Sequence, residues 1–368
     1  MGVQDMVPRW RAALKELLPD LHGHLINALS LFSLAMALAG HCHSGRLAAH
    51  APSRALVPSR QRRLERLLSN GRLKVKEALG GACSQLAAAV LLSLCSVPGR
   101  RLVLILDETP NGDRLKALKL SVGYRKRAVP IAWACYAPDS PPEPMPELIR
   151  SLLSGVSASV PDSCHVTLLA DRGLAWPCVA DCCVELGWHY VLRLQGQTKV
   201  RFLDGRGRRV EKHAKELAPF RGRRWTGHAE VFKTAGWREA NVVATWEPCC
   251  REPWLLVTDL PASFARCLGY CKRTWCEQMH RDEKSGGFNW GRSLVRDPEH
   301  AERLLLVMAL ATLLCVGLGT QAIKRGLRRL IEPTRRRTLS VFQLGLRRLK
   351  DAWTQGTALP LGVYLYPS

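Results

Sequence analysis

The order of strand and helix patterns after residue 101 limits the chain to few folds. Leu102 to Leu106 is a continuous apolar run, Lys116 to Tyr124 alternates polar with apolar residues, and Ala128 to Tyr136 is a third strand-like run. A helical period at 145–153, an apolar run at 166–170, a helical period at 176–186 and an apolar run at 189–194 follow. Three strands and then alternating helices and strands predict a mixed α/β sheet.

Two aspartates follow strands in this pattern. Asp107 closes the first strand in LVLILDET, and Asp171 closes the fourth in HVTLLADRG. The order of elements is that of the ribonuclease H-like fold, in which the first and fourth strands lie side by side and parallel, so the carboxyl ends of these strands should be neighbours. Sites gather where loops leave such ends. One Asp after a strand is more often a turn or helix-capping residue, but two at matching positions favour a functional site.

A third acid lies in a spaced set of polar residues. Tyr270, Arg273, Glu277 and Lys284 follow the spacing Y-x2-R-x3-E-x6-K inside a helical pattern that runs from Ala262 to about Ser285. At about 100° per residue, all four positions fall within roughly 60° of one another on the helix. Arg273 and Glu277 could form only a surface ion pair, worth a few tenths of a kcal/mol. That alternative does not account for Tyr270 and Lys284.

Three segments together resemble one family. LDET, LLADRGL and YCKRTWCEQMHRDEK followed by GGFNWGRS resemble the DDE transposases of bacterial insertion sequences, specifically the insertion sequence four family with its Y-x2-R-x3-E-x6-K signature. The resemblance covers roughly residues 101–318 and includes a β-rich insertion before the glutamate. In this family a second Asp often follows the first, whereas this chain has Glu108, which leaves the accessory role of that position open.

The resemblance implies the chemistry of the site. Asp107, Asp171 and Glu277 would be catalytic acids that bind two Mg²⁺ ions, with Mn²⁺ as a substitute. Three carboxylates suit Mg²⁺, which prefers hard oxygen ligands, and two such ions can activate an attacking hydroxyl and stabilise the leaving oxygen. The implied reaction is cut-and-paste transposition at terminal inverted repeats, by hydrolysis, hairpin formation and strand transfer. The residues implied as contacts to the phosphates of the transposon end are Tyr270, Arg273 and Lys284.

Charge and domain organisation agree with a DNA partner. The formal charge of +23, from 54 Lys and Arg against 31 Asp and Glu, creates a field that attracts polyanions, although anionic lipid would also fit. We expect a helical DNA-binding domain at 1–97, a ribonuclease H-like catalytic domain at 98–330 with a β-rich insertion at about 196–262, and a helical basic tail at 331–368. In the first of these, apolar residues recur three and four apart through Trp10 to Leu18, Leu25 to Leu38, Leu64 to Leu73 and Ala78 to Leu94. By resemblance, the working state would be a homodimer on paired double-stranded DNA ends. The arginines that could read the inverted repeats, or simply form a solvated basic helix face, are Arg54, Arg60, Arg62, Arg63 and Arg66.

Several features have ordinary explanations. Fourteen scattered cysteines fit buried thiols in a reducing bacterial cytoplasm, and we expect no export or anchoring signal. The apolar runs Leu25 to Ala39 and Leu304 to Leu318 are shorter than the roughly 20 residues that span a bilayer, so we expect buried core helices and no membrane partner. Hairpin formation needs a base moved out of the stack, and an aromatic residue of the insertion could stabilise it. The tryptophans there, each more often a core residue, are Trp225, Trp237, Trp246 and Trp254.

The sequence does not favour a zinc site, and it leaves two other functions open. No paired C-x2-C sets occur at finger spacing near the His and Cys residues that could suggest zinc. A catalytically silent descendant that only binds DNA ends, and a nuclease of the same fold without strand transfer, remain alternatives to an active transposase. The residues considered for zinc are His41, Cys42, His43, His50, Cys271 and Cys276.

Overall fold

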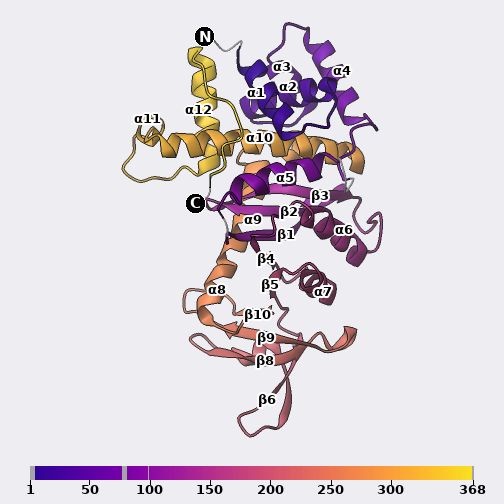
Figure 1. The fold of residues 1–368 in the computed structure, drawn as a ribbon, viewed down its shortest axis with the longest axis vertical. Coiled ribbons are helices and arrows are strands. Elements are labelled where there is room, and N and C mark those ends of the chain that lie inside the picture. Colours follow the sequence, from indigo (N-terminus) through magenta and orange to yellow (C-terminus); the bar gives the residue numbers. More distant parts are fainter. Residues whose placement is uncertain (1–4, 77–80, 98, 367–368) are drawn as a thin grey trace.

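The computed structural model describes residues 5–76, 81–97 and 99–366. Its strands form one sheet that runs along the length of the molecule (Figure 1). The strands are β1 (Arg101–Asn111), β2 (Leu115–Tyr124), β3 (Arg127–Tyr136), β4 (His165–Ala170), β5 (His189–Arg193), β6 (Lys199–Leu203), β7 (Arg209–His213), β8 (Arg224–Val231), β9 (Arg238–Thr245) and β10 (Trp254–Thr258).

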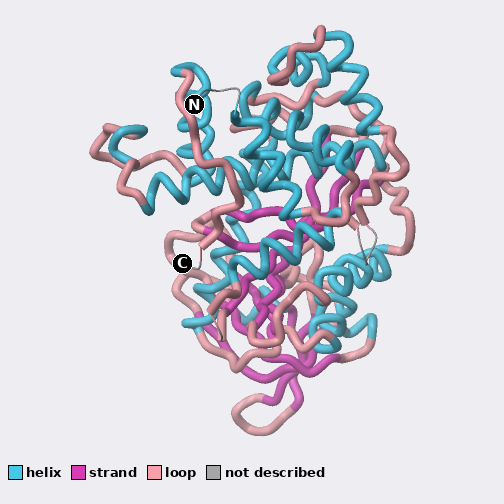
Figure 2. Tube along the Cα trace, turned by 45° about the horizontal axis from the view of Figure 1, so that its top comes forward, coloured by secondary structure: helices cyan, strands magenta, loops and turns pink. Residues whose placement is uncertain are grey.

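Most helices gather at one end of this sheet, and Figure 2 shows them at the top with the strands below. The mixed α/β architecture, with a large mixed sheet flanked by helices, agrees with the predicted fold class. The helices are α1 (Met6–Leu17), α2 (Gly23–Ala39), α3 (Ser44–His50), α4 (Val57–Leu68), α5 (Ala82–Leu94), α6 (Met145–Ser157), α7 (Pro177–Glu185), α8 (Phe264–Tyr270), α9 (Thr274–Glu283), α10 (Pro298–Lys324), α11 (Arg328–Ile331) and α12 (Val341–Gln355).

The ten strands lie in the order β3-β2-β1-β4-β5-β10-β9-β8-β6-β7. β1 pairs antiparallel with β2 and parallel with β4, and Leu106 is paired with Ala170. The predicted adjacency of the first and fourth strands is therefore confirmed. Asp107 and Asp171 directly follow these two paired residues, so they lie side by side at the carboxyl end of β4.

The predicted end of the first strand at Asp107 is wrong, because β1 continues to Asn111. Pairing with β4 stops at Leu106, whereas pairing with β2 continues to Asn111 opposite Leu115. Beyond Leu106 one side of β1 is thus an edge, where the missing N–H of Pro110 removes no ladder hydrogen bond. The extension carries Thr109 and Pro110 alongside the site.

The predicted β-rich segment at about 196–262 consists of strands that continue the same sheet. β10 pairs antiparallel with β5, β9 pairs with β10, and β8 pairs with β9. Figure 1 shows β8 and β9 crossing the lower part of the molecule, with the hairpin of β6 below them. Alternating apolar residues such as Ala240, Val242 and Ala244 bury one face of this extension.

The helix α10 is the centre of the helical end. It packs against α2, α12 and β3, and its residues from Ala301 to Ala322 are buried. By length and composition alone α10 could cross a membrane, and α2 with α3, bent by 97°, would pass as a broken span, but the most apolar window of α10 is wholly buried inside the protein. The predicted buried core helices at 25–39 and 304–318 lie within α2 and α10.

The helix boundaries differ in places from the predictions. α4 ends at Leu68 rather than Leu73, and α3 was not predicted. The helix predicted from Ala78 begins at Ala82 in the structure, and residues 78–80 lie outside the described part of the chain. Among the cysteines that the structure describes none forms a disulfide, and most are buried.

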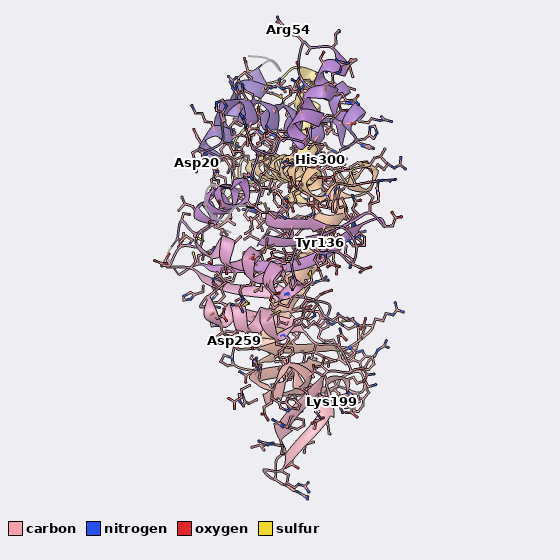
Figure 3. The ribbon with its side chains drawn as sticks, turned by 90° about the vertical axis from the view of Figure 1, so that its right-hand side faces the viewer. Asp20, Arg54, Tyr136, Lys199, Asp259 and His300 are labelled. Carbon is pink, nitrogen blue, oxygen red and sulfur yellow. The ribbon has the colours of Figure 1, made fainter. Side chains whose placement is uncertain are left out.

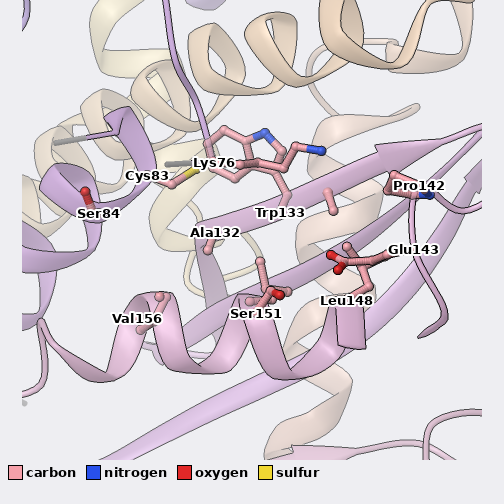
Figure 4. A pocket seen from close by; sticks show the side chains of 13 residues that line it. Lys76, Cys83, Ser84, Ala132, Trp133, Pro142, Glu143, Leu148, Ser151 and Val156 are labelled. Atoms are coloured by element: carbon pink, nitrogen blue, oxygen red, sulfur yellow. The ribbon is translucent and has the colours of Figure 1, made fainter. Parts of the chain in front are cut away.

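An apolar cavity of about 290 Å³ lies between α5, β3 and α6. Figure 4 shows Ala132 and Trp133 on one side of it and Leu148 and Val156 on the other. Lys76 also lines it, and its ammonium pairs with the buried Glu302 at 2.7 Å. None of the predicted site residues lines this cavity.

Candidate active site

The three acids singled out in the sequence come together around one arginine. Asp107 comes from β1, Asp171 follows β4 and Glu277 lies on α9. The Arg273 guanidinium lies among them, with Nη2 2.8 Å from Asp107 Oδ1 and 3.4 Å from Asp171 Oδ2. Its Nη1 donates to the Glu277 carboxylate one helical turn away. Four residues from three separate segments of the chain thus meet at one point.

Local structure explains how each acid reaches this point. Asp107 lies within β1, so its position is fixed by the sheet, and only 8% of its side chain is exposed. Asp171 begins the turn after β4, where its Oδ1 accepts a hydrogen bond from Gly173 N at 2.8 Å. Glu277 lies in the first turn of α9 and is 54% exposed. Two acids are therefore held by the sheet and its turn, and the third borders solvent.

Tyr270 is buried rather than at the surface. It is 4% exposed, and its hydroxyl donates to the Ala170 carbonyl oxygen at 3.2 Å, directly before Asp171. Its ring packs edge to face against Trp254, with 5.6 Å between centroids. This placement gives no support to a direct phosphate contact for Tyr270. The side chain instead joins the start of the signature to the end of β4.

The signature does not lie on one uninterrupted helix, so that prediction is wrong. α8 ends at Tyr270, a 3-10 turn spans Cys271 to Arg273, and α9 begins at Thr274. Lys284 follows the last residue of α9, with a non-helical ψ of −113°. The tighter turn changes the angle between residues, so equal steps of 100° do not hold across it.

Lys284 is attached to the extended end of β1. Its Nζ donates to Thr109 Oγ1 and to the Pro110 carbonyl oxygen, each at 2.9 Å. Burial lowers the pKa of this ammonium, and the charge of Lys119 lowers it further. An ammonium has three N–H donors, so one remains for a further acceptor.

The group of acids carries more negative than positive charge. Burial raises the pKa of Asp107, Arg273 opposes this effect, and the nearby Asp171 carboxylate adds to it. Burial by itself lowers the pKa of Arg273, but the Asp107 charge leaves it above its usual range. His280 is neutral, because burial and nearby cations lower its pKa to about 2. One guanidinium therefore faces three carboxylates.

Two further side chains touch Asp107, and no sequence pattern had connected either of them with the three acids. Cys276 Sγ and His280 Nδ1 each lie 3.4 Å from Asp107 Oδ2. Both are on α9, and His280 is three residues after Glu277, a spacing that shares a helix face. The same helical periodicity that grouped Arg273 with Glu277 could have included His280.

Two ion pairs hold the far end of α9 against the sheet. Lys119 of β2 and Glu283, which are 1% and 2% exposed, lie 2.5 Å apart. The Lys119 ammonium also lies 4.6 Å from the ring centroid of the buried Trp290. Asp282 accepts a hydrogen bond from Arg127 Nε at 2.8 Å. These contacts fix the residues immediately before Lys284.

A cavity of about 380 Å³ opens beside two of the acids. Asp107 and Asp171 line it, together with Trp176 and Glu108. The Glu108 carboxylate accepts a hydrogen bond from Tyr136 Oη at 2.5 Å and pairs with Lys116 at 3.1 Å. Glu108 is thus bound to Tyr136 and Lys116, whereas Asp107, Asp171 and Glu277 all contact Arg273.

The donor set fits a divalent cation. Among the residues that the structure describes, no three His, Cys, Asp or Glu side chains form a ready-made metal-binding group, because the carboxylates are arranged around a guanidinium. Their chemistry nevertheless matches hard cations: the donors are carboxylate oxygens and their negative charge exceeds that of Arg273. Asp107, Asp171 and Glu277 are the residues that could hold such an ion.

The four tryptophans of the β-rich segment have different surroundings. Trp225 and Trp246 pack against the hydrophobic core. Trp254 contacts Tyr270, as described above, and Trp237 lies under the guanidinium of Arg201, 4.2 Å from the ring centroid. The expectation that these residues are mostly packing residues agrees with these contacts.

Comparison with known proteins identifies the family. The family model described as transposase DDE domain matches residues 103–314, more than half of the 368-residue chain. This region contains all three acids and the sheet that positions them. No curated protein matches the chain. The chain belongs to the family of DDE-domain transposases.

Proposed function

We propose that this protein catalyses cut-and-paste transposition of an insertion sequence, by metal-dependent hydrolysis and strand transfer at terminal inverted repeats. The observation that carries the proposal is the convergence of Asp107, Asp171 and Glu277 on one cationic group from three separate segments. The spacing of Tyr270, Arg273, Glu277 and Lys284 supports assignment to the insertion sequence four family.

The three acids would hold two divalent cations, Mg²⁺ or Mn²⁺. When bound, such cations supply activation of the attacking water or 3′-hydroxyl and stabilisation of the leaving oxygen. The chain itself supplies a sheet that fixes Asp107 and a short turn that fixes Asp171. Cys276 and His280 cover Asp107 on the side of α9, which limits the access of water to that carboxylate.

Arg273 and Lys284 are the residues proposed to bind the DNA backbone next to the acids. A guanidinium can hold a phosphate through two parallel hydrogen bonds, and an ammonium acts as a point charge. Lys284 has one N–H free of its contacts to Thr109 and Pro110 and could direct it toward a phosphate. For Tyr270 we propose a positioning role through Ala170.

The other regions are proposed to bind DNA and a second copy of the chain. The helical region 1–97 would read the inverted repeats, 98–330 would cut and join, and the basic region 331–368 would contact the backbone. Arg54 lies at the helical extremity of the molecule, and Lys199 lies toward the opposite end (Figure 3). A homodimer on paired ends would place each active site on one end.

The test is a cleavage and joining assay with DNA that carries the ends of the element. In Mg²⁺ or Mn²⁺ the parent protein should nick and join this DNA, and Asp107→Ala, Asp171→Ala and Glu277→Gln should lose this activity while still binding it. Glu239→Gln is the matched control, because that glutamate is 80% exposed on β9. Acid variants that cut as well as the parent would refute the assignment.

The same assay separates the two alternatives. Nicks without joined products would favour a nuclease of this fold. Salt-sensitive binding with no metal-dependent cleavage would favour a silent descendant that occupies DNA ends.

A further inference from the structure

Leu294 is an exposed apolar residue with a strained backbone, in the segment that follows Lys284. Its φ is 62° and its side chain is 63% exposed. Of the six non-glycine residues with positive φ in the described part of the chain, only Phe232 and Leu294 are apolar, and Phe232 is buried. Left-handed backbone is costly for leucine, and such strain persists only where the surroundings enforce it, often at functional sites.

Contacts on both sides enforce this conformation. Ser293 is buried, and its N–H donates to the carbonyl oxygen of the fully buried Trp290 at 3.0 Å. Val295, on the other side, packs against the hydrophobic core. Arg114, at the turn between β1 and β2, donates from Nη2 to the Gly291 carbonyl oxygen at 2.8 Å. The segment is held to the protein while the Leu294 side chain projects from it.

Positive charge flanks this side chain. Arg292 and Arg296 are both exposed, and neither guanidinium forms an ion pair with any residue that the structure describes. Asp297, the nearest acid in sequence, caps α10 by accepting a hydrogen bond from His300 N at 2.8 Å. An apolar side chain between two unpaired arginines is complementary to DNA, where arginines bind phosphates and an apolar wedge enters between base pairs.

The position of the segment relates it to the acids. Gly291 is bound to the turn that follows β1, and β1 carries Asp107. From Asp107 to Asn111 the strand advances about 13 Å, at roughly 3.3 Å per residue. The segment is thus held beside the turn that follows β1, several residues along that strand from Asp107.

We propose that Leu294 is a wedge that inserts between base pairs of the double-stranded DNA whose scissile phosphate lies at the acids, with Arg292 and Arg296 on phosphates beside the inserted side chain. This inference rests on the proposed function and adds a specific contact to it. The strained backbone presents the side chain before DNA arrives, so no conformational entropy is lost in exposing it on binding.

The experiment places 2-aminopurine at successive positions of a transposon-end duplex and measures its fluorescence in the metal-free complex. The parent should raise the fluorescence several-fold at one or two adjacent positions, where stacking is lost. Leu294→Ala should return it to the level of free duplex while DNA affinity changes less than about threefold, and Leu294→Met should keep the increase. The matched control is Leu330→Ala, since that leucine is 81% exposed on α11.

Three other results would refute the proposal that Leu294 inserts between base pairs. If the parent cuts the ends but Leu294→Ala leaves the fluorescence increase unchanged, the wedge is refuted and the proposed function stands. If Leu294→Ala instead dissociates a dimer of the DNA-free protein in sedimentation, Leu294 is a contact between copies. A parent protein that neither binds nor cuts the ends refutes both proposals.

Discussion

The two ends of α9 both carry charged side chains, but their charge balance differs. At the carboxyl end each acid has a base: Glu283 pairs with Lys119 and Asp282 with Arg127. At the amino end three carboxylates share Arg273. The balanced pairs are buried and join α9 to β2 and β3. The unbalanced group faces solvent on one side. The ratio of acids to bases therefore distinguishes the structural ion pairs at one end of α9 from the candidate catalytic group at the other.

The physical reason lies in the cost of removing charge from water. A buried pair stabilises the fold only if each charge keeps its partner, and the loss of one partner leaves an uncompensated charge. Burial raises the pKa of the Asp107 carboxyl, the Asp171 carboxylate adds a smaller increase, and the ionised Asp107 therefore costs stability. Such groups are concentrated at functional sites.

The largest expected effect is at the balanced end. Lys119→Met leaves the 2% exposed Glu283 without its partner and should lower the free energy of unfolding by about 3–5 kcal/mol, measured by urea denaturation. The double variant Lys119→Met with Glu283→Leu should recover most of this loss. If Lys119→Met lowers the free energy of unfolding by less than about 1 kcal/mol, the ion pairs at the carboxyl end of α9 are not structural contacts of the kind proposed here.

The opposite result is expected at the unbalanced end. Asp107→Asn should lower the cleavage rate by about a thousandfold or more, yet make the metal-free protein slightly more stable at neutral pH. Because the folded-state pKa of Asp107 is raised, the ionised carboxylate disfavours the folded state once the pH exceeds the pKa in the unfolded chain. Asparagine resembles the protonated form, so the gain should shrink as the pH falls toward 4, the range of an ordinary Asp.

Thermal unfolding in EDTA at several pH values measures this difference. A variant that is less stable than the parent at pH 8 would mean that Arg273 outweighs the burial and repulsion at Asp107.

The smallest effect is expected in the sheet extension, where balanced pairs lie at the surface. Arg201 and Glu230 face each other across β6 and β8, with 2.5 Å between Nη2 and Oε1. A double-mutant cycle with Arg201→Ala and Glu230→Ala should give a coupling energy much smaller than that of the buried Lys119–Glu283 pair, and it should weaken in high salt. The cycle separates this term from the contact between Arg201 and Trp237. A coupling energy as large as that of the buried Lys119–Glu283 pair would show that contact with solvent does not weaken such ion pairs.

Local patterns were sufficient for much of the fold. The apolar runs that predicted β1 and β4 are buried strands, and their order predicted the parallel pair that places Asp107 beside Asp171. The extension of β1 through Pro110 was missed, because Glu108 to Asn111 has no apolar run and is held by its pairing with β2. That the β-rich segment continues the same sheet depends on pairing between β5 and β10, which no local pattern contains.

The site was predictable only in part, for a similar reason. The spacing around Glu277 singled out Arg273 and Lys284, which lie beside the acids and the end of β1. Lys119 looked like an exposed residue of an alternating strand and is buried, because its partner Glu283 is 164 residues away. The 3-10 turn before Thr274 was likewise invisible to a count of 100° per residue.

The central claim is that Asp107, Asp171 and Glu277 together bind divalent cations. Electron paramagnetic resonance of Mn²⁺ titrated into the complex with transposon-end DNA tests it directly. We expect Asp107→Asn, Asp171→Asn and Glu277→Gln each to weaken Mn²⁺ binding by about tenfold or more, with Glu239→Gln unchanged. If all three variants bind Mn²⁺ as tightly as the parent, the cations are held elsewhere and the claim is wrong.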